Sequence, residues 1–261
     1  MAKKWALVLG ASSGFGGAVS IKFAKEGYNI FGVHLDRKQT MPIVNETIAA
    51  IESHGAKAVY FNINAADEAL RGEALEKMKQ EMGEGDEIQM VLHSLAFGAL
   101  VPLVYDAEND KRMSEKQLTM TLDVMANAII FWVQALMGKD MLHRGAHIFT
   151  MTSAGGHRAW PNYGAVSGAK AASEAYIRQL ALELAPLGIA ANAIQAGVTD
   201  TAALRKIPGS DKMIDMALSL NPGNRLTSPE DVADIMYSIA QGTTWVTGNV
   251  IRADGGEDIV G

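Results

Sequence analysis

The fold class of this chain is decided by the stretch Trp5-Ala6-Leu7-Val8-Leu9-Gly10-Ala11-Ser12-Ser13-Gly14-Phe15-Gly16. Residues 5–9 form a short apolar run typical of a buried strand, and a helical pattern over Phe15–Lys25 starts where the glycines end. Glycines in such a turn let the backbone approach a ligand closely, and the helix that follows offers unpaired N–H groups and the positive end of its dipole. The turn G-x-x-x-G-x-G therefore predicts a site for a pyrophosphate.

Short apolar runs alternate with longer helical patterns along the rest of the chain. The expected strands are Trp5–Leu9, Asn29–Val33, Ala58–Phe61, Ile88–His93, His147–Thr152, Ile189–Ile194 and Val246–Ile251. The expected helices are Phe15–Lys25, Pro42–His54, Glu68–Met82, Ser114–Met137, Asn162–Ala185 and Pro229–Gln241. Most of the strands are continuously apolar, which is typical of parallel strands covered on both faces. We therefore expect one α/β domain over residues 1–261, a Rossmann-type doubly wound parallel sheet of about seven strands in the order 3-2-1-4-5-6-7.

Composition and charge narrow the class of protein. The 261 residues are 48% hydrophobic, which allows a sizeable core, and they include no cysteine, which excludes disulfides, thiolate nucleophiles and cysteine zinc sites. The lack of cysteine fits a cytoplasmic protein. A formal net charge of −6 argues against nucleic acid as a partner. We find no run of roughly 18 apolar residues, so no membrane span is expected. His93 and His157 show no metal-ligand spacing, so no metal is expected.

One segment, about Thr199–Thr227, is irregular in pattern. It contains the turn signals Pro208-Gly209 and Asn221-Pro222-Gly223 and follows a strand end, where open α/β sheets bind ligands. It is interpreted either as a mobile substrate loop or as an ordinary surface excursion. Its basic residues would help to bind an anionic carrier, or are simply solvated; they are Arg205, Lys206 and Lys212.

The end of the second strand is expected to meet the adenosine ribose of a dinucleotide. The sequence there is His34-Leu35-Asp36-Arg37-Lys38. An acidic residue at this point favours a free ribose 2′-hydroxyl, and basic residues favour a 2′-phosphate. Since His34 stands at the usual acidic position and Arg37 follows, NADPH is slightly favoured over NADH.

Several motifs together resemble the short-chain dehydrogenase/reductase family over nearly the whole chain. The glycine turn resembles the cofactor turn of that family, and Ser153 and Lys170 have the 17-residue separation of its catalytic serine and lysine. Thr247-Gly248-Asn249-Val250 and Asp254-Gly255-Gly256 resemble its last strand and following turn. The resemblance implies an NAD(P)H-dependent oxidoreductase. It also implies a homotetramer in which the long helices pair across subunits.

The position of the tyrosine departs from the majority pattern of the family. Val166 stands where Tyr-x-x-x-Lys would place the tyrosine, and Tyr163 gives Tyr-x6-Lys instead. This spacing resembles the divergent branch of enoyl-acyl-carrier-protein reductases, and Asp123 replaces the helix-four asparagine of the majority branch. Three further stretches resemble that branch: His93-Ser94-Leu95-Ala96-Phe97-Gly98, Arg158-Ala159-Trp160-Pro161-Asn162-Tyr163 and Gln195-Ala196-Gly197.

The resemblance implies catalytic roles for three residues. Tyr163 would donate to the thioester oxygen as negative charge develops there, and Ser153 would support the tyrosine or polarise the carbonyl. Lys170 would hold the nicotinamide ribose, and its charge would lower the pKa of Tyr163. The implied substrate is an α,β-unsaturated acyl thioester, carried by coenzyme A or by acyl carrier protein.

Two other functions stay open at this point. Many enoyl reductases have a second tyrosine where this chain has Ser153, so the set Ser153, Tyr163 and Lys170 also fits a carbonyl reductase or alcohol dehydrogenase. A non-catalytic nucleotide-sensing protein on the same fold is the third reading, and the intact set of three residues argues against it.

The residues expected to bind the cofactor follow the ends of the strands, with Asn62 as an alternative to Asn64 and a helix-cap role as an alternative for Thr201. They are Gly10, Ser12, Ser13, Gly14, Phe15, Gly16, His34, Asp36, Arg37, Asn64, Ser94, Leu95, Ala96, Lys170, Gly197, Val198, Thr199 and Thr201.

Overall fold

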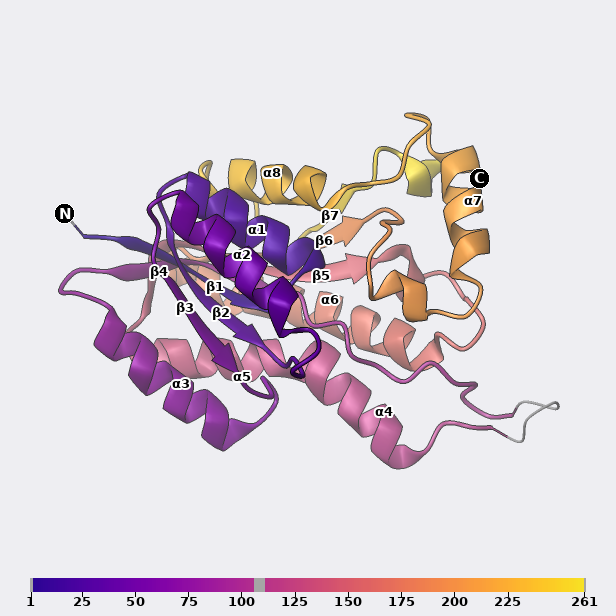
Figure 1. The fold of residues 1–261 in the computed structure, drawn as a ribbon, viewed down its shortest axis with the longest axis horizontal. Coiled ribbons are helices and arrows are strands. Elements are labelled where there is room, and N and C mark those ends of the chain that lie inside the picture. Colours follow the sequence, from indigo (N-terminus) through magenta and orange to yellow (C-terminus); the bar gives the residue numbers. More distant parts are fainter. Residues whose placement is uncertain (1, 106–110, 261) are drawn as a thin grey trace.

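Seven parallel strands form a single sheet in the order β3-β2-β1-β4-β5-β6-β7, which confirms the predicted fold class (Figure 1). The structure is a computed structural model that describes residues 2–105 and 111–260. The strands are β1 Lys4–Leu9, β2 Asn29–His34, β3 Ala58–Asn62, β4 Glu87–His93, β5 Leu142–Ser153, β6 Ala190–Ala196 and β7 Val250–Ala253.

Helices cover both faces of the sheet. They are α1 Gly14–Lys25, α2 Met41–Ser53, α3 Glu68–Glu81, α4 Glu115–Leu122, α5 Ala128–Gly138, α6 Gly164–Leu184, α7 Ser210–Leu220 and α8 Pro229–Ala240. In Figure 1, α1, α2 and α8 lie on one face and α3, α5 and α6 on the other. Strands β1, β2 and β6 are buried on both faces, which explains why their sequences do not alternate between apolar and polar residues.

Alternate residues of each strand supply two separate cores. Leu7 and Leu9 of β1 pack with Trp132 of α5 in one core, whereas Ala6 and Val8 pack in the other core, on the side of α1 and α8. The indole N–H of the fully buried Trp132 donates to the Ala65 carbonyl at 2.9 Å, so its one polar atom is satisfied. Both cores therefore hold the strand ends, and the loops that leave them, in fixed positions.

Two strands begin four or more residues away from their predicted starts, whereas the bounds of the other five differ by one or two residues. β5 begins at Leu142, five residues before the prediction, and β7 begins at Val250, four residues after it. The stretch before β7 is bound to β6 through the Thr247 and Asn249 side chains, and Gly248 has a left-handed φ of +77°. A strand cannot continue through that conformation, so the predicted start at residue 246 is wrong.

The predicted continuous helix Ser114–Met137 is interrupted. The π-helical segment Asp123–Asn127 separates α4 from α5, so the hydrogen-bonding pattern changes where Asp123 stands. Such wide turns insert one extra residue and are frequent at functional sites. Apolar periodicity alone does not reveal the insertion, because the pattern continues on both sides of it.

The segment around residues 199–227 is more regular than expected. Its middle forms α7, Ser210–Leu220, which begins after Gly209 in a left-handed conformation (φ +80°). The prediction of an irregular segment is wrong for these residues, since the turn signals at residues 208–209 and 221–223 mark the two ends of a helix.

The helical stretch Glu115–Gly138 is long and apolar enough to cross a membrane by length and composition alone. Half of its most apolar window is buried inside the protein. α5 supplies Ile129, Trp132 and Leu136 to the core, so packing against the sheet already accounts for the apolar composition.

Candidate active site

The glycine turn between β1 and α1 is built so closely that side chains are excluded. Gly10 has φ +93°, and a Cβ there would lie 2.5 Å from the Ser94 carbonyl oxygen at the end of β4. A Cβ on Gly16 would overlap the Gly10 carbonyl oxygen. Gly14 is also left-handed, with φ +55°. The turn therefore brings the first turn of α1 against the carboxyl ends of β1 and β4.

The first turn of α1 offers free backbone donors. Ser13 is the N-cap residue, has an extended backbone, and makes no side-chain capping hydrogen bond within the described part of the chain. Ser12 is anchored instead by its carbonyl, which accepts from the Thr47 hydroxyl at 3.0 Å. The dipole end and N–H groups of α1 thus suit an anion such as a pyrophosphate.

The end of β2 presents an ordered carboxylate and an exposed guanidinium. The Asp36 carboxylate lies 3.0 Å from the ring Nδ1 of buried His34, and its backbone is held on both sides by the Asn62 amide. Arg37 follows and is exposed. Asn62 thus positions Asp36, whereas the Asn64 side chain accepts from the Ala66 N–H in its own turn.

The ends of β4 and β6 complete the cofactor edge. Ser94 N–H donates to the Leu9 carbonyl at 2.8 Å, which ties the turn Ser94-Leu95-Ala96 to β1. After β6, the Thr199 hydroxyl donates to the Gly197 carbonyl at 3.0 Å. Thr201 lies beside Gly14, since a Cβ on that glycine would be 3.9 Å from the Thr201 methyl.

Other predicted residues of this edge have local roles. The Thr201 hydroxyl accepts from the Leu204 N–H at 3.2 Å, as the alternative cap role expects. The Val198 N–H donates to the Glu257 carboxylate at 3.0 Å. The start of the loop after β6 is therefore held by the C-terminal segment, at Glu257. The end of the same loop, at Thr201, lies beside the glycine turn.

Tyr163 lies at the N-cap of α6, immediately outside the helix. Its ring packs over Gly155, because a Cβ there would lie 2.5 Å from Tyr163 Cε1 and 3.2 Å from the Ser153 hydroxyl oxygen. Asn162, just before it, has a left-handed φ of +65°, a conformation that asparagine tolerates better than most residues. Tyr163 and Ser153 are thus brought together, as predicted, by a turn that requires glycine at position 155.

Replacing Gly155 with alanine is expected to lower kcat about 10- to 100-fold, because the new methyl displaces the tyrosine ring, and a displacement of about 1 Å costs that much. Gly168→Ala is the matched control, since a Cβ there meets nothing within 4 Å. Steady-state kinetics with thermal melts would measure both variants. Equal kcat values for the two would show that the contact between ring and backbone does not position Tyr163.

Lys170 is buried, with 7% of its surface exposed, so the expectation that it is not a surface lysine is confirmed. Its ammonium donates to the Met151 carbonyl of β5 at 2.8 Å. Burial lowers the pKa of Lys170 to about 8, and the charge of Glu174 opposes this effect. The pKa of Lys170 thus lies about one unit above neutral pH, so the ammonium is mostly charged at pH 7 and close to the range useful for proton transfer.

His93 is a neutral structural residue, as expected. It is 1% exposed, and its two ring nitrogens bond to the Thr150 hydroxyl at 3.1 Å and the Val124 carbonyl at 3.0 Å. Burial, together with the nearby charge of Lys170, lowers the pKa of His93 to about 4. Its bond to Val124 ties β4 to the π-helical segment.

The predicted lowering of the Tyr163 pKa is wrong for this structure. Burial raises the pKa of Tyr163, and the nearby Ser153 hydroxyl opposes the rise. The Ser153 oxygen is buried and makes no hydrogen bond of standard geometry within the described residues. A protonated phenol and an unpaired hydroxyl thus face the same place, which suits a carbonyl oxygen that needs two donors.

The C-terminal segment holds the loop that precedes Tyr163, and sequence reasoning missed this. The carboxylate of Asp258 is 3% exposed and pairs with Arg158 at 2.8 Å, His157 at 3.1 Å and Arg252 at 3.3 Å. The Gln195 amide of β6 also donates to it at 2.8 Å. The partners are distant in sequence, so no local pattern identifies them. The pair Gly155-Gly156 is a local signal of the close turn under Tyr163, and it was not singled out from the sequence.

Apolar side chains surround the entrance next to Tyr163. Leu103 packs onto Gly164, and Phe97 is 61% exposed. Gly209, just before α7, lies against the Trp160 ring. The predicted basic character of this rim is reduced, because Arg205 forms ion pairs with Asp200 at 2.7 Å and Asp211 at 2.6 Å. The rim therefore favours an apolar group.

The predicted cofactor residues fit a dinucleotide by their chemistry. The glycine turn leaves room that a Cβ would fill, α1 offers N–H donors, and Lys170 is a buried cation on α6, the helix that Tyr163 precedes. Among the residues that the structure describes, no group of three or more His, Asp or Glu side chains could hold a metal ion.

Comparisons with known proteins agree with this geometry. Residues 10–257 match the family model described as Enoyl-(Acyl carrier protein) reductase. The chain is 27% identical over 259 residues to 1-cyclohexenylcarbonyl-CoA reductase of Streptomyces collinus, covering 97% of this chain and 86% of that protein.

Two solved structures share the fold. Enoyl-acyl-carrier-protein reductase (NADH) from Aquifex aeolicus VF5 superposes with a TM-score of 0.83 at 22% identity, covering 100% of this chain and 98% of that one. The 3-oxoacyl-acyl-carrier-protein reductase from Brucella melitensis, in complex with NAD, gives 0.84 at 20% identity, covering 100% and 99%.

Proposed function

This chain belongs to the Enoyl-(Acyl carrier protein) reductase family, within the short-chain dehydrogenases/reductases, and on that premise we propose that it reduces the C=C bond of an α,β-unsaturated acyl thioester. The observation that carries the proposal is the position of Tyr163, outside the start of α6, seven residues before buried Lys170 and packed on Gly155. The coenzyme A thioester in the name of the Streptomyces relative supports the substrate class.

The residues of the site divide the chemistry among them. A nicotinamide dinucleotide held by the cofactor residues would supply the hydride for the β-carbon of the thioester. Tyr163, kept protonated by burial, donates a hydrogen bond to the thioester oxygen, where negative charge develops. The Ser153 hydroxyl is the second donor to that oxygen. Since both donors are in place before the reaction, they stabilise the transition state more than the ground state.

Lys170 supports the phenol. Hydride addition at the β-carbon leaves an enolate, and a proton from Tyr163 converts it into the saturated thioester. We assign the stabilisation of the remaining phenolate to Lys170, the buried cation of α6. Its remaining N–H donors are available to ribose hydroxyls, while one donates to Met151. Ammonium and phenol therefore act as one unit, and both must be protonated at the start of turnover.

Of the two nicotinamide dinucleotides, NADPH is the proposed cofactor. The Asp36 carboxylate is engaged by His34, and the Asp36 backbone by Asn62. The exposed Arg37 guanidinium is then the group best suited to a 2′-phosphate. A lower KM for NADH than for NADPH would contradict this choice.

A carbonyl reductase or alcohol dehydrogenase is the second candidate. It is favoured by Ser153, whose unpaired buried hydroxyl would polarise a ketone as readily as a thioester. The Brucella structure is named for reduction of a 3-oxoacyl group, and it supports this alternative only through its fold.

Turnover assays separate the two candidates. Oxidation of NADPH and NADH is followed at fixed cofactor concentration with crotonyl-coenzyme A, acetoacetyl-coenzyme A and a panel of ketones. The proposal expects kcat/KM for the unsaturated thioester to exceed that for every ketone. Turnover of ketones alone would overturn it in favour of the second candidate.

We further propose a homotetramer, as the family resemblance implies, and a cytoplasmic location, which the lack of cysteine fits. Exposed apolar residues on the helices and at the sheet edge support an interface between copies: Phe131 on α5, Leu182 on α6 and Trp245 before β7. Light scattering at micromolar concentration would measure the assembly, and a monomer would contradict it.

Acyl carrier protein is the proposed partner. This is tested by comparing kcat/KM for a crotonyl group carried by acyl carrier protein with kcat/KM for crotonyl-coenzyme A.

A further inference from the structure

Glu174 lies one helical turn beyond Lys170 on the same face of α6. Its carboxylate accepts a hydrogen bond from the Thr152 hydroxyl at 2.5 Å. Thr152 is the neighbour of Met151, whose carbonyl accepts from the Lys170 ammonium. α6 and β5 therefore fix this carboxylate near a buried cation, although none of the steps described above uses it.

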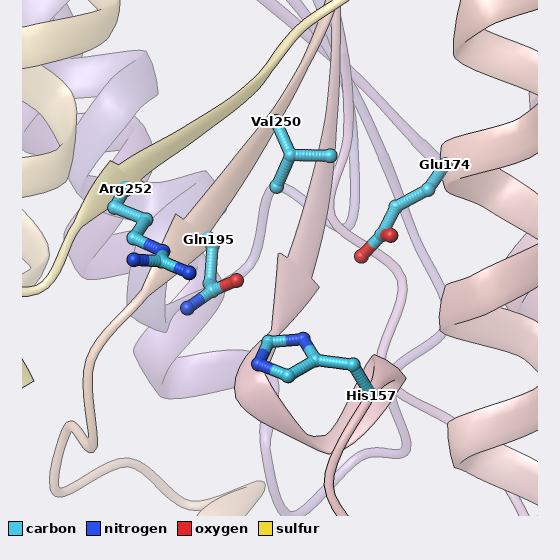
Figure 2. Close-up of a pocket in the computed structure, with 5 residues that line it drawn as sticks. All are labelled: His157, Glu174, Gln195, Val250 and Arg252. Atoms are coloured by element: carbon cyan, nitrogen blue, oxygen red, sulfur yellow. The ribbon is translucent and has the colours of Figure 1, made fainter. Parts of the chain in front are cut away.

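The carboxylate of Glu174 also faces an open cavity of about 590 Å³. Figure 2 shows Glu174 pointing into it from α6, with Gln195 and Arg252 across from it and His157 at one end. None of these lining residues is a predicted cofactor ligand. The size and polar lining of the cavity admit water, and water stabilises a charged carboxylate.

Other titratable groups on the elements around Lys170 do not replace Glu174. His93 of β4 is neutral near pH 7, since its pKa is lowered to about 4, mainly by burial. Tyr163 is protonated, since burial raises its pKa. Asp123 of the π-helical segment accepts from the Asn127 amide at 2.9 Å. Glu174 is thus the carboxylate whose charge acts on Lys170.

We propose that Glu174 is a positioning residue that keeps the Lys170 ammonium charged at neutral pH, in place for Tyr163. This inference rests on the proposed function, because it is turnover through Tyr163 that requires the charge. Without the Glu174 carboxylate, the buried ammonium still carries the free-energy cost of desolvation, but it loses the favourable interaction with a negative charge that offsets this cost. The pKa of Lys170, now about 8, then falls, and part of the enzyme carries a neutral lysine at physiological pH.

A stability experiment without substrate or cofactor tests the coupling. The folded-state pKa of Lys170, about 8, is below its ordinary value of 10.5, so its protonation opposes folding between those values and stability rises with pH. In Glu174→Gln this rise begins at lower pH. Urea unfolding should show the variant less stable than wild type near pH 7, with a difference that narrows toward about pH 9.5, where both lysines are neutral.

Two controls isolate the charge. Glu183→Gln removes a carboxylate of the same helix that bonds to Gln179, and should show no such pH-dependent difference. In a Lys170→Met background, Glu174→Gln should lose the pH-dependent part of its effect. A stability difference that is constant with pH, or that persists in the Lys170→Met background, would overturn the proposal and leave Glu174 a structural residue bound to Thr152.

The pH profile of turnover is the second readout. In Glu174→Gln, the alkaline limb of the kcat profile should move down by about one pH unit, so activity beyond the limb falls about tenfold while activity near pH 6 is nearly unchanged. Glu174→Asp should lie between. A uniform loss at every pH would contradict the proposal. Absence of enoyl turnover by the wild type would instead refute the proposed function, and the stability result would still decide the role of Glu174.

Discussion

Tyr163→Phe is expected to lower kcat for thioester reduction by about 10²- to 10⁴-fold while the dissociation constant for the cofactor stays nearly constant. The substitution keeps the ring that packs on Gly155 and removes only the hydroxyl. Burial keeps that hydroxyl protonated, so its loss removes the donor that meets the developing negative charge. Single-turnover measurements of NADPH oxidation, with cofactor affinity from fluorescence titration, would give the two quantities separately.

Tyr176→Phe is the matched control for this variant. Tyr176 lies on α6 as well, and its hydroxyl donates to the Asn127 side chain at 3.0 Å, away from Ser153 and Lys170. It should lose some stability and little activity. If Tyr163→Phe kept the wild-type rate, the phenol would not be the donor, and the alternative of a carbonyl reductase using the same hydroxyl would be refuted with it.

Gly16→Ala is expected to weaken cofactor binding by on the order of 100-fold or more, or to prevent folding. A Cβ at Gly16 would overlap the Gly10 carbonyl oxygen, which belongs to the backbone of the turn and cannot rotate away. Relief requires α1 to move off β1, and overpacking of this kind costs about 1–3 kcal/mol or more, where each 1.4 kcal/mol is tenfold in affinity. Calorimetric titration with NADPH, alongside a urea melt, would measure both consequences.

The neighbouring glycine provides the control for this second variant. A Cβ on Gly17 would lie 3.7 Å from the Thr47 hydroxyl, an ordinary contact, so Gly17→Ala should bind cofactor normally. Both variants change the helix propensity equally, so any difference between them comes from the turn. Equal affinities for the two would mean that the close approach of Gly16 to Gly10 does not shape the cofactor site.

The fold could be predicted because its signals are local. The apolar runs, the helical patterns and the glycines at positions 10, 14 and 16 each depend on a few neighbouring residues, and short right-handed connections leave few strand orders to consider. The start of β7 and the helix α7 were missed because a glycine or a turn signal fits more than one local structure. The turn signals around α7, for example, are equally typical of an irregular loop and of the two ends of a helix. At Gly248 the chain is still hydrogen-bonded to β6, but its left-handed φ of +77° is not that of a strand, so β7 begins only at Val250.

The electrostatics of the site could not be predicted from spacing. The spacing of Tyr163 and Lys170 suggested a pKa lowered by the nearby charge, but burial determines the direction for both groups. Burial depends on the whole chain, and so do the contacts of Asp258, whose partners come from residues 157 to 252. The set of reacting residues is visible in the sequence, and their protonation states are not.

The placement of Tyr163 before α6, rather than within it, has an evolutionary consequence. Lys170 is fixed by the packing of the helix on β5, whereas the phenol is aimed by Gly155, by the left-handed Asn162 and by the loop that Asp258 holds. Selection on loop residues can therefore redirect the acid without disturbing the cation. Divergence toward new substrates is open to such an enzyme through substitutions that leave the helix carrying the buried lysine untouched.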